Sequence, residues 1–288
     1  MFTFAKILFD IKLSECTDKY LLFGIRNYFC PAFVDASARL RDNNAVSAVF
    51  DQELATNPAA LRRFQKPPLP FAFHLPLLNI ADNEPSACSI TLTIAGTAVN
   101  HLAVFLLAME LALDELAAQA SISISVSRCC SVASDGGLSE LSDSGDGLIL
   151  LSSSEFVDGA YELVKLELVT PLRLIRQGKV LRDLSFPNLV RSLMRRVSSL
   201  AYYYGNIDLE CDFKWLSEIS TQARVVAIDM QSAKWPVLQE GMLGSITYSG
   251  VAPEFQQFLQ TGSEFNAGKG AAYGGGEFRM LNSENEYP

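Results

Sequence analysis

Apolar residues occupy every second position near the start of the chain: Ala5, Ile7, Phe9, Ile11 and Leu13. Lys6, Asp10 and Lys12 fall between them, with Leu8 as the exception, and a period of two is typical of a strand with one buried face. We therefore expect a strand here. Alternation recurs over residues 90–94 and 122–126, and the strongly apolar stretch between these two strands predicts a helix over about 97–118.

The second half of the chain shows a regular succession of patterns. We expect a strand, a helix, two strands, a short helix and a last strand, over residues 162–175, 187–204, 223–230, 243–249, 253–261 and 276–281. The order βαββαβ is typical of the ferredoxin-like split βαβ, in which two helices cover an antiparallel sheet. The first half has enough strands for a second copy. We therefore expect an α+β protein with two tandem ferredoxin-like domains, 1–155 and 156–288, the N-terminal one degenerate.

Two regions interrupt these patterns. Residues 20–70 contain aromatic, basic and proline-rich stretches, which indicate short helices joined by irregular connections. Residues 128–155 are rich in Ser, Asp and Gly, and indicate a long hairpin or a linker.

Composition narrows the class of protein. Of the 288 residues, 49% are hydrophobic and 19% are charged, which excludes a mainly disordered chain. The six cysteines never form a C-x-x-C pair and there are two histidines, so we expect no metal site. The longest unbroken apolar stretch, 102–109, is shorter than a membrane span, and the N-terminus lacks the pattern of a secretory signal. We expect a cytoplasmic protein without a membrane partner.

Charge is distributed unevenly along the chain. The formal net charge is −9, which argues against a global basic field for nucleic acid. Residues 171–196, however, carry +6, and the remainder carries −15. The basic residues of this segment are Arg173, Arg176, Lys179, Arg182, Arg191, Arg195 and Arg196. Because Arg191 and Arg195 are four positions apart, we expect them on one face of the predicted helix.

A glycine-rich segment follows the short helix near the C-terminus. Five residues separate Gly262 from Gly268, and Lys269 is followed by Gly270 where a phosphate-binding P-loop has Ser or Thr. The spacing of Gly268, Gly270 and Gly274 also departs from the dinucleotide fingerprint. These departures exclude an NTPase and a Rossmann site, and leave a backbone that can approach a partner closely, with one cation in it.

Three runs of the sequence resemble the C-terminal domain of the CRISPR-associated Cas-six (Cas6) family, in the RAMP superfamily. They are PLRLIRQGKVLRDLSFPNLVRSLMRRVSSLAYYYG, GMLGSITYSG and FLQTGSEFNAGKGAAYGGGEFRM, within residues 160–281. The run SITLTIAGTAVNHLAVFLLAMELALDEL is similar to the N-terminal half of the same family.

The resemblance implies a protein that binds CRISPR repeat RNA and cuts it without metal to release guide RNAs. It implies no cofactor, and other CRISPR effector subunits as further partners. The basic segment and the glycine-rich loop then become the candidate RNA-binding residues, namely Arg173, Arg176, Lys179, Arg191, Arg195, Arg196, Gly268, Lys269, Gly270 and Gly274.

The catalytic residues stay unassigned. Metal-free RNA cleavage needs a base for the 2′-hydroxyl, an acid for the 5′-oxygen and cations for the phosphorane charge. Family members commonly place a histidine in the N-terminal domain, whereas this chain has none before His74. The candidates are His74, His101, Tyr20, Tyr28, Lys12, Lys19 and Arg26.

Two alternatives stay open. The first is a catalytically inactive RAMP-like subunit that binds RNA or serves as a scaffold in a CRISPR complex. The second is a small-molecule enzyme on the same fold, for which the sequence offers no recognisable acid and base cluster.

Overall fold

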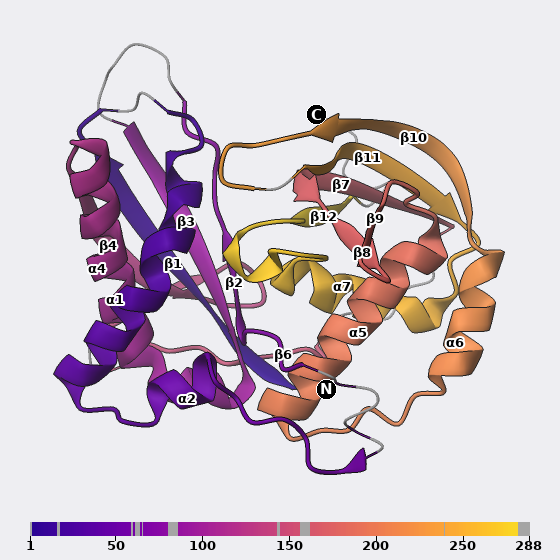
Figure 1. Ribbon diagram of the computed structural model, residues 1–288, viewed down its shortest axis with the longest axis horizontal. Helices are drawn as coiled ribbons and strands as arrows, with labels where there is room; N and C mark the ends of the chain where they lie inside the picture. The colour runs from indigo at the N-terminus through magenta and orange to yellow at the C-terminus, as the bar shows by residue number, and fades with distance from the viewer. Residues whose placement is uncertain are drawn as a thin grey trace. The chain divides into compact units, whose positions relative to one another are not determined.

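The chain folds into two compact units (Figure 1). The computed structural model describes residues 2–15, 18–58, 60, 64, 66–79, 86–142, 145–155, 162–238 and 240–281. The N-terminal unit contains Thr3–Glu53 and Leu69–Leu151, and the C-terminal unit contains Met1–Phe2, Leu54–Pro68 and Ser152–Pro288. Two segments that precede residue 155 thus pack with the C-terminal half.

The N-terminal unit is a ferredoxin-like βαββαβ fold. Its main elements are β1 (Thr3–Leu13), α1 (Ile25–Leu40), β2 (Phe71–His74), β3 (Ser86–Ala95), α4 (Leu102–Ala120) and β4 (Ile124–Val132). The smaller ones are α2 (Ala45–Val49), β5 (Leu138–Glu140), β6 (Leu151–Ser152) and 3-10 turns at Leu21–Gly24 and Gly96–His101. Along the sheet the strands run β2-β3-β1-β4-β5, and each neighbouring pair is antiparallel.

The alternation in β1 gives the strand one buried face, as predicted. Its apolar side chains are buried, and the charged side chains between them are more exposed. The helices α1 and α4 pack against each other through aromatic rings. The ring centroids of Phe33 and Phe105 lie 4.9 Å apart, and those of Phe29 and Phe71 lie 5.3 Å apart. These contacts form the core of the unit.

The prediction of short helices over residues 20–70 is wrong for residues 25–40. They form one helix, α1, with Pro31 in its interior. Proline removes one hydrogen bond of the helix and normally interrupts it. Here Phe29 and Phe33, on either side of the proline, are fully buried, and this burial offsets the lost bond.

The helical segment Gly96–Ala120 has the length and mean hydropathy, 1.6, of a membrane-spanning helix. It includes α4, whose residues Val104, Phe105, Ala108 and Met109 are buried inside the N-terminal unit. A helix that is apolar on most sides is also typical of a protein core. The packing of α4 favours that interpretation.

The C-terminal unit repeats the βαββαβ order. Its main elements are β7 (Leu163–Leu172), α5 (Phe186–Gly205), β10 (Arg224–Ala233), β11 (Gly241–Ser249), α7 (Gln256–Phe265) and β12 (Phe278–Leu281). The antiparallel sheet runs β10-β11-β7-β12. The predicted fold class, two tandem ferredoxin-like domains, is therefore confirmed.

Other elements of this unit were not expected from the sequence pattern. A hairpin of β8 (Leu174–Arg176) and β9 (Lys179–Leu181) follows β7, and the short helix α6 (Phe213–Ile219) follows α5. Three-residue 3-10 turns occur at Ser220–Gln222, Pro253–Phe255 and Ala271–Tyr273. The hairpin and α6 border the surfaces on which the basic residues lie.

Candidate nucleic-acid interface

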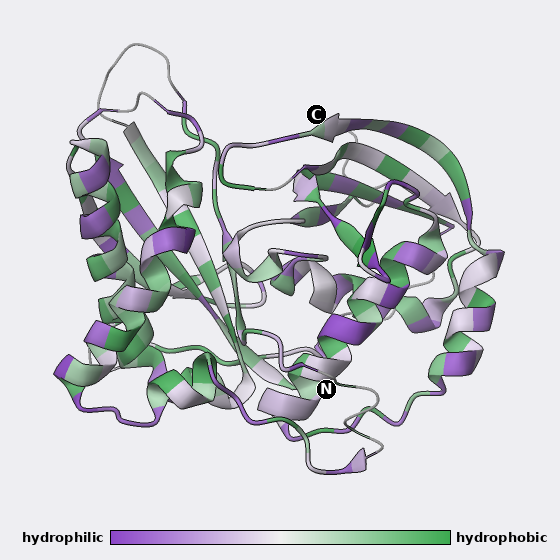
Figure 2. Cartoon of the chain, in the orientation of Figure 1, coloured by the Kyte–Doolittle hydropathy of each residue, from purple (hydrophilic) through white to green (hydrophobic). Residues whose placement is uncertain are grey.

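The helix α5 separates its apolar and its basic residues onto different faces. Leu189, Leu193 and Val197 are buried, whereas Arg191 and Arg195 are exposed. The spacing of three and four positions produces this division. Figure 2 shows the result as hydrophilic bands along α5 with hydrophobic bands between them.

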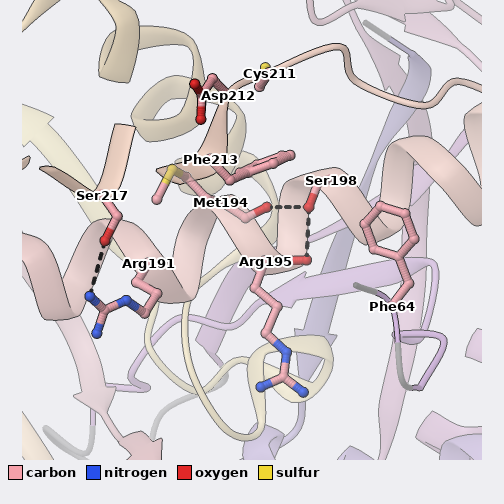
Figure 3. A pocket seen from close by; sticks show the side chains of 9 residues that line it. All are labelled: Phe64, Arg191, Met194, Arg195, Ser198, Cys211, Asp212, Phe213 and Ser217. Carbon is pink, nitrogen blue, oxygen red and sulfur yellow. Dashed lines mark hydrogen bonds between the residues drawn. The ribbon is translucent and has the colours of Figure 1, made fainter. Parts of the chain in front are cut away.

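Arg191 and Arg195 line a cavity of about 550 Å³ in the C-terminal unit (Figure 3). Its other walls include Phe213 and Ser217 from α6, and Phe64. The Arg191 guanidinium donates a hydrogen bond of 3.2 Å to the hydroxyl of Ser217, which links α5 to α6. The cavity thus combines two cations with aromatic rings.

Asp212 fixes the start of α6 and also lines this cavity. Its Oδ1 accepts hydrogen bonds from the backbone N–H groups of Lys214, at 3.0 Å, and Trp215, at 2.9 Å. This is the N-cap arrangement that begins many helices. Among the described residues, Oδ2 of Asp212 accepts no hydrogen bond, so one oxygen stays available.

The glycine-rich loop is held against the end of β7 and the start of β8. The backbone N–H of Lys269 donates to the carbonyl of Arg173 at 2.9 Å, and that of Gly276 donates to Pro171 at 3.1 Å. The hydroxyl of Thr170 donates to the carbonyl of Gly274 at 2.7 Å. The structure therefore brings together Arg173 and Lys269, which are far apart in sequence.

Gly268 is required where the loop meets Arg173. Its φ is +75°, and a Cβ at this position would lie 2.5 Å from the Arg173 carbonyl oxygen. A larger residue would be strained by its backbone and would displace the strand. Glycine thus allows Lys269 to approach β8, and the Lys269 side chain itself is exposed.

Arg173 and Arg182 line a second cavity, of about 210 Å³, together with Glu240. The Nε of Arg173 is buried and has no hydrogen-bond partner among the described residues. Arg182 lies 3.7 Å from Glu240, in an exposed pair of the kind that contributes little to stability. Arg176 and Lys179 are exposed on either side of the β8–β9 turn.

Arg196 lies in a different environment from its neighbours on α5. Its side chain is half-buried, and its Nε donates a 2.8 Å hydrogen bond to the carbonyl of Phe265 at the end of α7. Burial lowers the pKa of Arg196 to about 10, so it stays protonated at neutral pH. The contact ties α5 to the start of the glycine-rich loop.

The described structure shows little neutralisation of these cations. In the part of the chain that the structure describes, no carboxylate oxygen lies within 4 Å of the guanidinium groups of Arg173, Arg176, Arg191 or Arg195. Of the predicted RNA-binding residues, Arg191 and Arg195 line the cavity at α5, and Arg173 lines the cavity at the β8–β9 hairpin; the others line neither cavity. Both cavities belong to the C-terminal unit.

The candidate catalytic residues lie in the N-terminal unit and are spread along its sheet. Lys12 pairs with Ala87 near one end of β3, and Lys19, Tyr20, Arg26 and Tyr28 follow β1 at that end. His74 pairs with Thr91, near the middle of the sheet. His101 follows β3 at its opposite end. These residues therefore form no single cluster.

His101 has a carboxylate partner. Its Nδ1 lies 2.6 Å from Oδ2 of Asp42, just beyond the C-terminus of α1, and both side chains are partly buried. A carboxylate on one ring nitrogen fixes the orientation of the imidazole and leaves the other nitrogen for proton transfer. Among the described residues, no group of three His, Cys, Asp or Glu side chains is arranged to hold a metal ion.

Sequence reasoning missed Asp212, Phe213 and Arg182 as candidate site residues. Arg182 belongs to the basic segment, but only its position beside Arg173 in the cavity singles it out. A signal for α6 was present, since Asp212 precedes an apolar and basic run as N-cap residues do. Seven residues are too few for a helical period to be recognised by itself.

Comparison with known proteins agrees with this arrangement. Residues 166–278 match the model of the family described as CRISPR-associated endoribonuclease Cas6. The match runs from Leu166, within β7, to Phe278, the first residue of β12, and thus includes α5 and the glycine-rich loop. The resemblance seen in the sequence is confirmed over this part of the chain. A search of curated proteins found no match.

Solved structures match nearly the whole chain. A histidine-to-alanine mutant of Cas6 (TTHA0078) matches with a TM-score of 0.59 and 14% identity, over 98% of this chain and 100% of that one. The product complex of Thermus thermophilus Cas6 (TTHB231) matches with a TM-score of 0.59 and 13% identity, over 98% and 100%. A partial Cas6-RT-Cas1–Cas2 complex matches with a TM-score of 0.61 and 11% identity, over 100% and 47%. At these identities the likeness concerns the fold.

Proposed function

We propose, from the match of residues 166–278 to the Cas6 family, that this chain binds CRISPR repeat RNA and processes it. The observation that carries the proposal is the set of exposed and partly exposed cations on the C-terminal unit. Arg191 and Arg195 share one cavity, Arg173 and Arg182 share another, and Lys269 is bonded through its backbone to Arg173. One guanidinium group can donate two parallel hydrogen bonds to two oxygens of the same phosphate. A surface with several arginines is therefore suited to bind the phosphate backbone of RNA.

The acidic remainder of the chain fits this function. A charge of +6 in residues 171–196 stands against −15 elsewhere, so RNA is attracted to one region and repelled from the others. The local concentration of positive charge then determines where the RNA strand binds on the protein. Base contacts are still needed for preference among sequences.

The same proposal includes cleavage of the bound repeat RNA. This step needs no metal ion and releases guide RNAs. The 2′-hydroxyl attacks the adjacent phosphorus and loses its proton to a base, while the 5′-oxygen leaves and gains a proton from an acid. Of the candidates, His101 is the best prepared base, because Asp42 orients its ring. Stabilisation of the phosphorane charge needs a cation close to the scissile phosphate.

The alternative is an RNA-binding scaffold subunit without cleavage. The absence of any histidine before His74, and the spread of the candidate catalytic residues along the sheet, favour it. Other CRISPR proteins would then be partners of the chain. One of the similar structures is described as a Cas6-RT-Cas1–Cas2 complex, and this chain covers 30% of the matched chain.

The two functions are separated by incubating the protein with its repeat RNA in the presence of a chelator. We expect one discrete cut, which is lost in His101→Ala and retained in His74→Ala. Uncut RNA that is nevertheless bound would establish the scaffold. A cut that both variants perform would exclude His101 as the base, and failure to prefer repeat RNA over random RNA would contradict the proposed function.

A further inference from the structure

The α5–α6 cavity, defined by Phe64, Arg191, Arg195, Asp212 and Phe213, has properties beyond those of a phosphate-binding surface. Its volume of about 550 Å³ lies within the range of roughly 300–1,000 Å³ that is usual for sites of small organic groups. A phosphate group alone would leave most of this space unfilled. The additional space is lined by rings and by one carboxylate.

Of the two rings, Phe213 offers a flat apolar face, whereas Phe64 is buried, at 2% exposure. Phe213 is partly exposed in the first turn of α6 and lies along the cavity in Figure 3. Phe64 is fixed on the other side by stacking on Tyr202, with ring centroids 4.8 Å apart and planes inclined by 26°. Proteins that bind single-stranded RNA use such side chains to stack unpaired bases.

The charged groups are arranged to suit the two ends of a nucleotide. Arg191 and Arg195 supply two cations one turn apart on α5, and both suit phosphate oxygens. Asp212 supplies one carboxylate, whose Oδ1 is committed to the cap of α6. Its Oδ2 is an acceptor without a donor among the described residues, and a base with an amino group can provide that donor.

We propose that this cavity takes up one unstacked base of the bound RNA, stacks it on Phe213 and selects bases that carry an exocyclic amino group. Adenine, cytosine and guanine offer an exocyclic amino group to Asp212, whereas uracil offers only its ring N3–H. The inference rests on the proposed RNA binding and adds a base-specific subsite to it. Arg191 and Arg195 hold the flanking phosphates.

The first experiment replaces the ring. Single-stranded ten-nucleotide oligoadenylate is titrated against wild type, Phe213→Ala and Trp215→Ala at one salt concentration, with thermal melting to confirm folding. Trp215 is a matched control, because it is an exposed aromatic residue of the same helix and does not line the cavity. We expect Phe213→Ala to weaken binding about tenfold, and Trp215→Ala to leave it unchanged. Equal affinities of the two variants would overturn the proposal.

The second experiment replaces the hydrogen-bond acceptor Asp212 by asparagine. Its result does not depend on whether Phe213→Ala folds stably. Asp212→Asn keeps a good helix cap and can present an amide N–H₂ donor where Oδ2 stood. We expect wild type to bind oligoadenylate and oligocytidylate several-fold more tightly than oligouridylate, and Asp212→Asn to lose or reverse this preference. The same preference in both proteins would overturn the proposal.

The outcomes distinguish the cavity from the proposed function. If oligonucleotides bind with a clear salt dependence but neither Phe213→Ala nor Asp212→Asn has an effect, the base subsite is refuted and RNA binding stands. If no oligonucleotide binds and repeat RNA does not bind either, both are refuted.

Discussion

Gly268 shows, at the scale of single residues, how backbone conformation positions a cation. Its positive φ turns the loop, and the absence of a side chain lets the next N–H reach the carbonyl of Arg173. Gly270, two residues on, has a similar φ of +89° but open space where a Cβ would be. At Gly270 a side chain would cost only the strain of the left-handed backbone. At Gly268 it would cost this strain and also a collision with the Arg173 carbonyl.

Replacement by alanine should distinguish these two glycines. We expect Gly270→Ala to lower the free energy of unfolding by about 1 kcal/mol, because only the left-handed conformation is strained. Gly268→Ala adds a collision with the Arg173 carbonyl, and we expect a loss of about 2–4 kcal/mol. Urea unfolding of both variants measures the difference. Equal losses would show that Gly268 tolerates a Cβ and that the loop does not depend on this contact.

Single residues also mark the limit of sequence-based prediction. Spacing on a helix correctly separates Arg191 and Arg195 from the apolar stripe. The same spacing cannot reveal that Arg196 donates to Phe265, because that contact depends on the packing of α7 against α5. The site of Asp212 was missed for a similar reason, since its role appears only when α6 lies beside α5.

At the scale of elements, strands and helices with a clear apolar period were predictable. The strands β1, β7 and β11 and the helix α5 occur where the pattern placed them. The pattern failed for α1, where a proline suggested a break, and for the β8–β9 hairpin, whose strands have three residues each. Tertiary burial overrides local preference in α1, and three residues show no period.

The pairing of β1 with β4 includes an ion pair that should respond to pH. Hydrogen bonds from Ser89 and then from Arg128 lower the pKa of Asp10 below its ordinary value. A lowered pKa in the folded state means that the ionised Asp10 stabilises the fold above the unfolded pKa, near 3.8. This contribution is lost as the pH falls through the folded value.

We therefore expect Asp10→Asn to be slightly less stable than wild type at neutral pH and equally stable in acid. The effect should be small, because surface pairs contribute little. Urea unfolding at pH 7 and below pH 3 measures it, with Ser89→Ala as a second variant that removes the larger hydrogen bond. A stability difference that grows on acidification would contradict this account.

At the scale of the whole molecule, the sequence predicted two ferredoxin-like domains but not that a segment from the first half of the chain would pack with the C-terminal unit. Leu54–Pro68 packs with the C-terminal unit although it lies among residues of the other. The hydroxyls of Tyr203 and Tyr204 donate to the carbonyls of Phe64 and Pro68, each at 2.8 Å. Such long-range hydrogen bonds leave no periodic trace in the sequence.

Charge at this scale determines how RNA affinity depends on salt. Each phosphate neutralised by a cation releases counterions, and the log–log slope of affinity against salt is about −0.7 per phosphate for single strands. If five to seven phosphates are engaged, the slope should be roughly −3.5 to −5. The remaining surface, which carries most of the acids, should contribute little to it.

The most direct test is the salt slope of repeat-RNA binding in wild type and in Arg191→Gln, Arg195→Gln and Arg39→Gln. Arg39 is an exposed arginine of the N-terminal unit and is already paired with Asp35 at 2.6 Å, so it serves as the control. We predict that each α5 variant reduces the magnitude of the slope by about 0.7 and that Arg39→Gln leaves it unchanged. A wild-type slope near zero, or α5 variants with the wild-type slope, would contradict the claim that these cations hold the RNA.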